Sequence, residues 1–75
     1  MGQGRGVNEK FKTPLPNGYV VSTVKVDTLD ENLKTVKMWE TMVFNPQGEE
    51  VYCHREKYKK DAENHHRIAV VNYMK

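Results

Sequence analysis

The chain has little of what stabilises or localises many small proteins. It contains one cysteine, Cys53, among 75 residues, which excludes an internal disulfide and a cysteine-rich zinc site. Its apolar runs are only a few residues long, too short to span a membrane as a helix. The first ten residues contain no apolar core of a signal peptide, so we expect a cytosolic setting.

An excess of one sign of charge is also missing. Twelve Lys and Arg residues oppose ten Asp and Glu residues, which leaves a formal net charge of +2. The basic residues are interleaved with acids, as in KYKKDAENHHR, and form no stripe with aromatic residues. We therefore expect only weak, salt-sensitive binding to nucleic acid. A chain of this length forms one domain with a small core, and such domains often depend on a metal, on disulfides or on partner subunits.

What the chain does contain is three short segments rich in β-branched and aromatic residues. Residues 19–27 (YVVSTVKVD), 36–45 (VKMWETMVFN) and 50–55 (EVYCHR) each predict a strand. The intervening Asn-Pro-Gln-Gly of residues 45–48 suits a type I turn, so the last two segments predict a hairpin. Large apolar side chains occupy both faces of the middle segment, and we expect both of these faces to be covered.

The C-terminal segment predicts a helix. Residues 57–73 lack Gly and Pro, and one stripe of the helix would carry Tyr58, Ala62, His65 or His66, Ala69 and Tyr73. The second half of this helix is apolar most of the way round, which indicates burial on more than one side and hence a subunit interface. We therefore predict an α+β fold of order β-β-β-α, with a three-stranded antiparallel sheet and one C-terminal helix, assembled as a homo-oligomer. Residues 1–14 are expected as a flexible arm and residues 15–75 as a single small domain.

Polar residues inside the apolar strands are the candidates for function, and each has a structural alternative. Glu40 is either an exposed strand residue or a buried acceptor that orients a basic side chain or holds a ligand N–H. Trp39 is either core or a platform on which a base stacks. Arg55 either binds phosphate or pairs with a surface carboxylate. The small hydroxyls of strands, such as Ser22 and Thr41, are either ordinary strand residues or donors to a phosphate or ribose.

Metal binding and catalysis find little support in the sequence. In Cys53-His54 and in His65-His66 the adjacent side chains point apart, so each pair offers one ligand to a given point. Their spacing matches no zinc pattern, and we expect no metal and no cofactor. The sequence shows no signature of a nucleophile with its oxyanion hole and no glycine-rich phosphate loop, so we expect no enzyme activity.

One combination of motifs resembles a known group of proteins. The strings LPNG, VSTV (residues 21–24) and WETMVF (residues 39–44), followed by Arg55 and by Ala62 with His66, resemble a pattern found in small phage-encoded proteins. These are similar to anti-CBASS sponges, which sequester cyclic-nucleotide signals of bacterial immunity. The resemblance implies a homo-oligomer, a dimer or tetramer, that encloses a cyclic dinucleotide without cleaving it in the cytoplasm of an infected bacterial host.

The resemblance and the polar positions together give one candidate ligand site. Its expected residues are Ser22, Thr23, Trp39, Glu40, Thr41, Arg55 and His66. A cyclic dinucleotide requires cations and hydroxyls for two phosphates, a flat aromatic group for a purine and a carboxylate for a guanine edge. Two alternatives stay open: a small interaction protein that binds a host protein directly, by adding a strand to a sheet edge, and a weak nucleic-acid-binding regulator.

Overall fold

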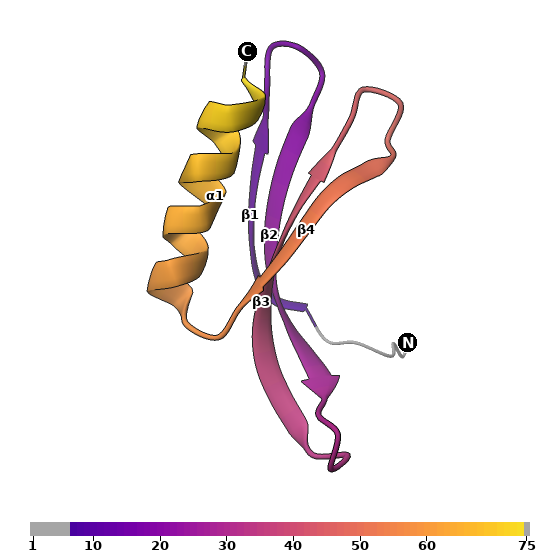
Figure 1. Cartoon of the computed structure of the whole chain (residues 1–75), viewed down its shortest axis with the longest axis vertical. Helices are drawn as coiled ribbons and strands as arrows, with labels where there is room; N and C mark the ends of the chain where they lie inside the picture. Colours follow the sequence, from indigo (N-terminus) through magenta and orange to yellow (C-terminus); the bar gives the residue numbers. More distant parts are fainter. Residues whose placement is uncertain (1–6, 75) are drawn as a thin grey trace.

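The protein is an α+β domain in which one helix covers one face of an antiparallel sheet (Figure 1). The structure, a computed structural model, describes residues 7–74. The sheet has the strand order β1-β2-β3-β4, so every strand pairs with its neighbour in the sequence. The elements are β1 (Val7–Pro14), β2 (Val20–Leu29), β3 (Thr35–Phe44), β4 (Glu50–Glu56) and α1 (Lys59–Tyr73).

The sheet has four strands, and the prediction of three is corrected. The additional strand, β1, lies within residues 1–14, the segment expected as a flexible arm; residues 1–6 of that arm lie outside the described residues. β1 pairs with β2 through a tight turn in which Gly18 has a φ of +94°, a conformation that glycine adopts without strain. The Pro and Gly residues that seemed to end an arm thus form the turn of a hairpin. Phe11 is the only apolar side chain in the stretch of residues 9–13, so β1 carries a weak strand signal.

The turn between β3 and β4 confirms the sequence prediction. The amide of Gly48 donates to the Asn45 carbonyl at 2.8 Å, and Gly48 has a φ of +85°. The Asn45 side-chain oxygen also accepts from the amides of Gln47 and Glu49. An Asn at the first position of this turn therefore satisfies amides that the strands leave unpaired.

The core lies between α1 and the face of the sheet that the helix covers. Its centre is Leu15, Val21, Val43 and Ala69, with Tyr19, Tyr52, Val70 and Tyr73 packed around it. Three helix positions, Ala62, His66 and Ala69, are buried, and they belong to the stripe that the sequence predicts. The helix begins two residues later than expected, at Lys59, so Tyr58 lies before its first turn and is 65% exposed.

Much apolar surface remains outside this core. In the second half of α1, Ile68 and Val71 are each more than half exposed, as is Met74 directly after the helix. The far end of the β2–β3 hairpin extends beyond the helix (Figure 1), and Leu29 and Leu33 are exposed there. Across residues 7–74, the chain forms no helix long and apolar enough to cross a membrane.

Candidate functional site

The expected site residues lie on the two opposite faces of the sheet. Thr23, Trp39 and Thr41 project toward α1, where His66 meets them. Ser22, Glu40 and Arg55 project to the other face, which we call the open face because α1 does not cover it. Neighbouring residues of a strand point to opposite faces, so the structure does not bring these side chains into one cluster. The single site that the sequence predicted is therefore corrected to two separate groups.

The group beneath the helix is a chain of hydrogen bonds that are buried or partly buried. His66 lies between Thr13 and Thr23, with Nε2 at 2.9 Å from the Thr13 hydroxyl and Nδ1 at 2.7 Å from the Thr23 hydroxyl. The Thr23 and Thr41 hydroxyls are 2.8 Å apart. Among the described residues, no buried side-chain nitrogen or oxygen lacks a partner. These residues join α1 to the first three strands, and their polar groups satisfy one another.

Burial also determines the charge of His66. The side chain is desolvated, which lowers the pKa of His66 below its ordinary value of 6.5. The imidazole is thus neutral at pH 7, with one ring nitrogen donating and the other accepting. A neutral histidine with a hydrogen bond at each ring nitrogen links the helix to the sheet and offers no cation to a phosphate.

Trp39 belongs to the interior. It is 3% exposed, its ring stacks on Phe11 with the centroids 5.6 Å apart, and Lys25 Nζ lies 5.6 Å from the Trp39 ring centroid. Of the two roles considered for Trp39, packing is the one that the chain uses. The ring leaves no face for a base to stack on, and it lies on the opposite side of the sheet from Arg55.

Glu40 and Arg55 form an ion pair on the open face. Glu40 is only 5% exposed, and its Oε2 accepts a hydrogen bond of 2.9 Å from Arg55 Nε. The Arg55 side chain is 64% exposed. Of the alternatives for Glu40, the structure shows a buried acceptor that orients a basic side chain. The terminal nitrogens of the Arg55 guanidinium carry further N–H donors besides the Nε–H that binds Glu40.

A shallow pocket of about 390 Å³ lies on the same open face, near the β1–β2 and β3–β4 turns. Lys10 and Lys12 of β1, Ser22 of β2 and Phe44 of β3 line it, together with residues of the two turns. Lys12 pairs with Ser22, and Lys10 stands in a cross-strand row that continues through Val24 and Glu40. The pocket therefore combines two ammonium groups, a hydroxyl and an aromatic ring. Sequence reasoning missed both lysines and Phe44, because β1 was not predicted and Phe44 was assigned only to packing.

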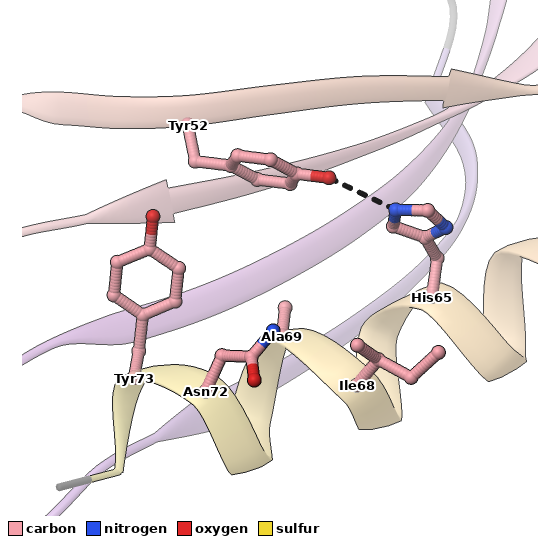
Figure 2. Close-up of a pocket in the computed structure, with 6 residues that line it drawn as sticks. All are labelled: Tyr52, His65, Ile68, Ala69, Asn72 and Tyr73. Atoms are coloured by element: carbon pink, nitrogen blue, oxygen red, sulfur yellow. Dashed lines mark hydrogen bonds between the residues drawn. The ribbon is translucent and has the colours of Figure 1, made fainter.

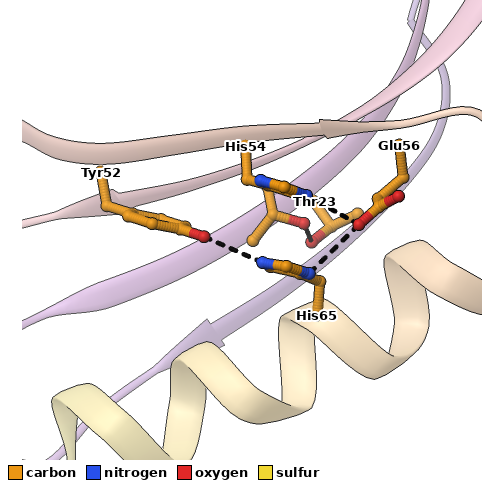
Figure 3. A network of polar contacts seen from close by, with 6 residues as sticks. Thr23, Tyr52, His54, Glu56 and His65 are labelled. Carbon is orange, nitrogen blue, oxygen red and sulfur yellow. Dashed lines mark hydrogen bonds and ion pairs between the residues drawn. The ribbon is translucent and has the colours of Figure 1, made fainter.

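A second polar cluster lies on the helix side, at the edge formed by β4 (Figure 3). Glu56 Oε2 is 2.7 Å from His54 Nε2 and 3.1 Å from His65 Nδ1. The two imidazole rings stack, with centroids 3.7 Å apart and planes 5° apart. The Tyr52 hydroxyl is 2.9 Å from His65 Nε2. As the sequence indicated, the pairs Cys53-His54 and His65-His66 each supply one residue to the cluster, namely His54 and His65. The participation of Glu56 and Tyr52 was not predicted.

Next to this cluster, β4 and α1 enclose a pocket of about 200 Å³ (Figure 2). Tyr52 and His65 form one end, and Ile68, Asn72 and Tyr73 line the remainder. Burial, followed by the nearby Tyr73, Cys53 and Glu56, raises the pKa of Tyr52 above 10.0. The Tyr52 phenol is therefore protonated at neutral pH and available as a hydrogen-bond donor to His65.

Comparisons of the chain with family models, with curated proteins and with solved structures give no match.

Proposed function

We propose that this protein is a phage-encoded sponge that binds and sequesters a cyclic dinucleotide immune signal, without cleaving it, in the cytoplasm of an infected bacterial host. The observation that supports this proposal most is the open face of the sheet, where Lys10, Lys12 and Arg55 extend cations around Ser22 and Phe44. The sequence motifs point to the class of ligand, and the open face supplies the groups that such a ligand requires.

The separation of the cations suits a ligand with two phosphates. Lys10 and Arg55 stand in one cross-strand row, through Val24 and Glu40, on the two outer strands. Three interstrand spacings separate their backbones by about 14 Å, so the two long side chains must extend toward each other to contact the two phosphates of one compact ring. Each end of the row can therefore bind its own phosphate, with charge-assisted hydrogen bonds from Arg55 and from the lysines.

Other groups on the face provide for the base and the sugar. The Phe44 ring replaces Trp39 as the aromatic group on which a base stacks, since stacking tolerates any aromatic side chain. The Ser22 hydroxyl stands next to Lys12 across the β1–β2 pair and is a hydrogen-bond donor for a phosphate or a ribose. Glu40 orients Arg55, and its carboxylate is also of the type that accepts the N–H groups of a guanine edge.

Enclosure of the ligand requires a second copy of the chain. The open face is shallow, so one protomer covers only one side of a bound nucleotide. The exposed apolar side chains of Ile68 and Val71 on α1, and of Met74 directly after it, are available for contacts between subunits in a dimer or tetramer. Closure over the ligand would make dissociation slow and the affinity correspondingly high.

Titration of the purified protein with a panel of cyclic dinucleotides, including cyclic GMP-AMP, tests the proposal by calorimetry. Loss of a charge-assisted bond is worth about 1.5–3 kcal/mol, so Arg55→Gln should weaken binding about 10- to 150-fold. The matched control is Lys60→Ala, which removes one exposed cation from α1, away from the open face. This control should keep the affinity within about twofold of the wild type.

Light scattering during gel filtration, with and without nucleotide, tests the enclosure. A strict monomer in both conditions contradicts it, and the absence of heat and of a melting-temperature shift with every nucleotide contradicts the ligand class. Capture of one host protein in stoichiometric amount, with no nucleotide effect, would favour strand addition at the β1 or β4 edge instead. Tight oligonucleotide binding that falls steeply with salt would favour the nucleic-acid alternative.

A further inference from the structure

Three metal-ligating side chains converge where β4 meets α1 (Figure 3). His54 and Glu56 stand two residues apart on β4 and therefore share a face, and His65 approaches them from the helix. One potential ligand atom from each lies within 4.8 Å of the others. We propose that this cluster is a binding site for a divalent transition metal ion, with Zn²⁺ as the best-matched ion. This site goes beyond the proposed nucleotide-binding function and lies on the opposite face of the sheet.

The distances suit a small ion. Zn²⁺ binds histidine nitrogen and carboxylate oxygen at about 2.0–2.2 Å, which places tetrahedral ligand atoms about 3.3 Å apart. Glu56 Oε2 is 2.7 Å from His54 Nε2 and 3.1 Å from His65 Nδ1. These two separations must therefore widen by less than about 1 Å to admit the ion, and the stacked rings of His54 and His65 must tilt so that their nitrogens point at it. All three are only partly buried, with exposed side-chain fractions of 22–39%, so they have this freedom.

The cluster already contains the partner that orients a metal-bound histidine. A ligating imidazole normally donates its other ring N–H to a neighbouring acceptor. The Tyr52 hydroxyl lies 2.9 Å from His65 Nε2. With the ion on Nδ1, His65 would carry its proton on Nε2 and donate it to the Tyr52 oxygen. Tyr52 would thus act as a positioning residue for His65.

The donor set decides the class of metal. Two imidazoles and one carboxylate favour zinc and neighbouring transition metals over Mg²⁺ or Ca²⁺, which prefer oxygen ligands. Cys53 is adjacent to His54 on β4 and so projects to the open face, which leaves the site without a thiolate. Three protein ligands leave the fourth tetrahedral position to water.

Metal binding would also stabilise a weak part of the fold. α1 packs more extensively against β2 and β3 than against the edge strand β4. An ion held by His65 and by two residues of β4 would tie the helix to this edge. A chain of 75 residues has a small core, and domains of this size are often stabilised by such a link.

Titration of the metal-stripped, full-length protein with ZnCl₂ tests the proposal. We expect one ion per chain and a melting temperature that rises by about 10 °C or more once free Zn²⁺ reaches 100 times Kd. Tyr52→Phe should weaken Zn²⁺ binding about 10- to 100-fold, and loss of a direct ligand in His65→Gln or Glu56→Gln should weaken it further. The matched controls are Cys53→Ser, next to a ligand, and Glu50→Gln, an exposed carboxylate at the start of β4; both should bind Zn²⁺ as the wild type does.

Circular dichroism of each variant without metal shows whether it folds, so a loss of binding can be separated from a loss of structure. Substitution of Co²⁺ into the wild-type protein gives a readout that needs no variant. Intense visible bands without a thiolate charge-transfer band are expected of a four-coordinate nitrogen and oxygen site. Unchanged Zn²⁺ affinity in folded His65→Gln, loss of binding in Cys53→Ser, or a weak octahedral cobalt spectrum would each overturn the assignment. Nucleotide affinity should be the same in His65→Gln, which separates this test from that of the open face.

Discussion

Beneath α1, Thr23 and His66 bind one another and are shielded from water, whereas on the open face Lys10, Lys12 and Arg55 extend cationic groups into solvent. Both sets are polar residues in or beside the same β-rich segments. Their roles differ because a buried polar group must find a partner within the protein, while an exposed one can bind a ligand. A polar residue in an apolar strand therefore becomes a functional candidate only when its face is known.

The largest expected effect is on the covered face. Trp39→Ala should lower the free energy of unfolding by about 3–5 kcal/mol, which is comparable to the whole stability of a domain this small. Phe44 is half-buried on the open face, and Phe44→Ala should cost only about 2 kcal/mol. Urea denaturation followed by tryptophan fluorescence for Phe44→Ala, and by circular dichroism for Trp39→Ala, measures both. Equal losses would mean that the open face is a second core.

The two threonines of the buried chain differ in the number of hydrogen bonds that each one makes. Thr23→Val leaves both His66 and Thr41 without their shared partner, and should cost about 2–3 kcal/mol. Thr41→Val removes the hydrogen bond to Thr23 alone, and should cost about 1 kcal/mol. Both variants keep the β-branched shape, so denaturation curves compare the hydrogen bonds directly. The reverse order of stability would contradict the assignment of Thr23 as the central residue.

The pH dependence of stability reports on His66. Burial lowers the pKa of His66 in the folded state, so below about pH 6.5 the unfolded chain binds a proton that the folded chain does not. Stability is therefore full above pH 6.5 and falls as the pH drops toward the folded pKa, by at most about 1.4 kcal/mol per pH unit. Denaturation of the wild type and of His66→Gln between pH 7.5 and 5 isolates this contribution, because the two proteins differ only at residue 66. Parallel curves for the two proteins would show that His66 is not the group responsible.

The smallest effect is expected where α1 no longer covers the sheet. Lys37 Nζ and Asp27 Oδ1 are 2.7 Å apart toward the end of the β2–β3 hairpin, with side chains 54% and 36% exposed. Such exposed pairs contribute about 0–1 kcal/mol, so Asp27→Asn should change the free energy of unfolding by less than about 0.5 kcal/mol. Thermal denaturation at low and high salt checks this. A loss of several degrees in the melting temperature would show that this end of the hairpin is more protected than its exposure indicates.

Local patterns account for most of the fold. Their content of β-branched and aromatic residues predicted β2, β3 and β4 to within a few residues, and the absence of Gly and Pro together with a three- and four-residue apolar repeat predicted α1. β1 escaped detection because Phe11 stands almost alone among polar residues, and its pairing with β2 becomes evident only when the Pro14–Gly18 segment is recognised as a turn. Its strand character comes from hydrogen bonds to β2 more than from its own composition.

The sequence predicts less of the candidate site than of the fold. Period-two alternation already places Trp39 and Glu40 on opposite faces, so the sequence could have excluded a site that contains both. It could not show that Glu40 is buried and paired with Arg55, because both depend on how the neighbouring strands come together in the sheet. The cluster of His54, Glu56 and His65 was beyond prediction, because it depends on the rotation and position of α1 against β4.

The amino-acid sequence alone determined which residues share a face of each element, because a repeat of two or 3.6 residues follows from backbone geometry. It determined the order of the predicted strands and helix and the β3–β4 turn. Only the tertiary structure decided which faces meet, and with them the buried Thr23–His66 chain, the cations of the open face and the His54–Glu56–His65 cluster. These groups join residues far apart in the chain, and their approach depends on the packing of α1 and of all four strands together.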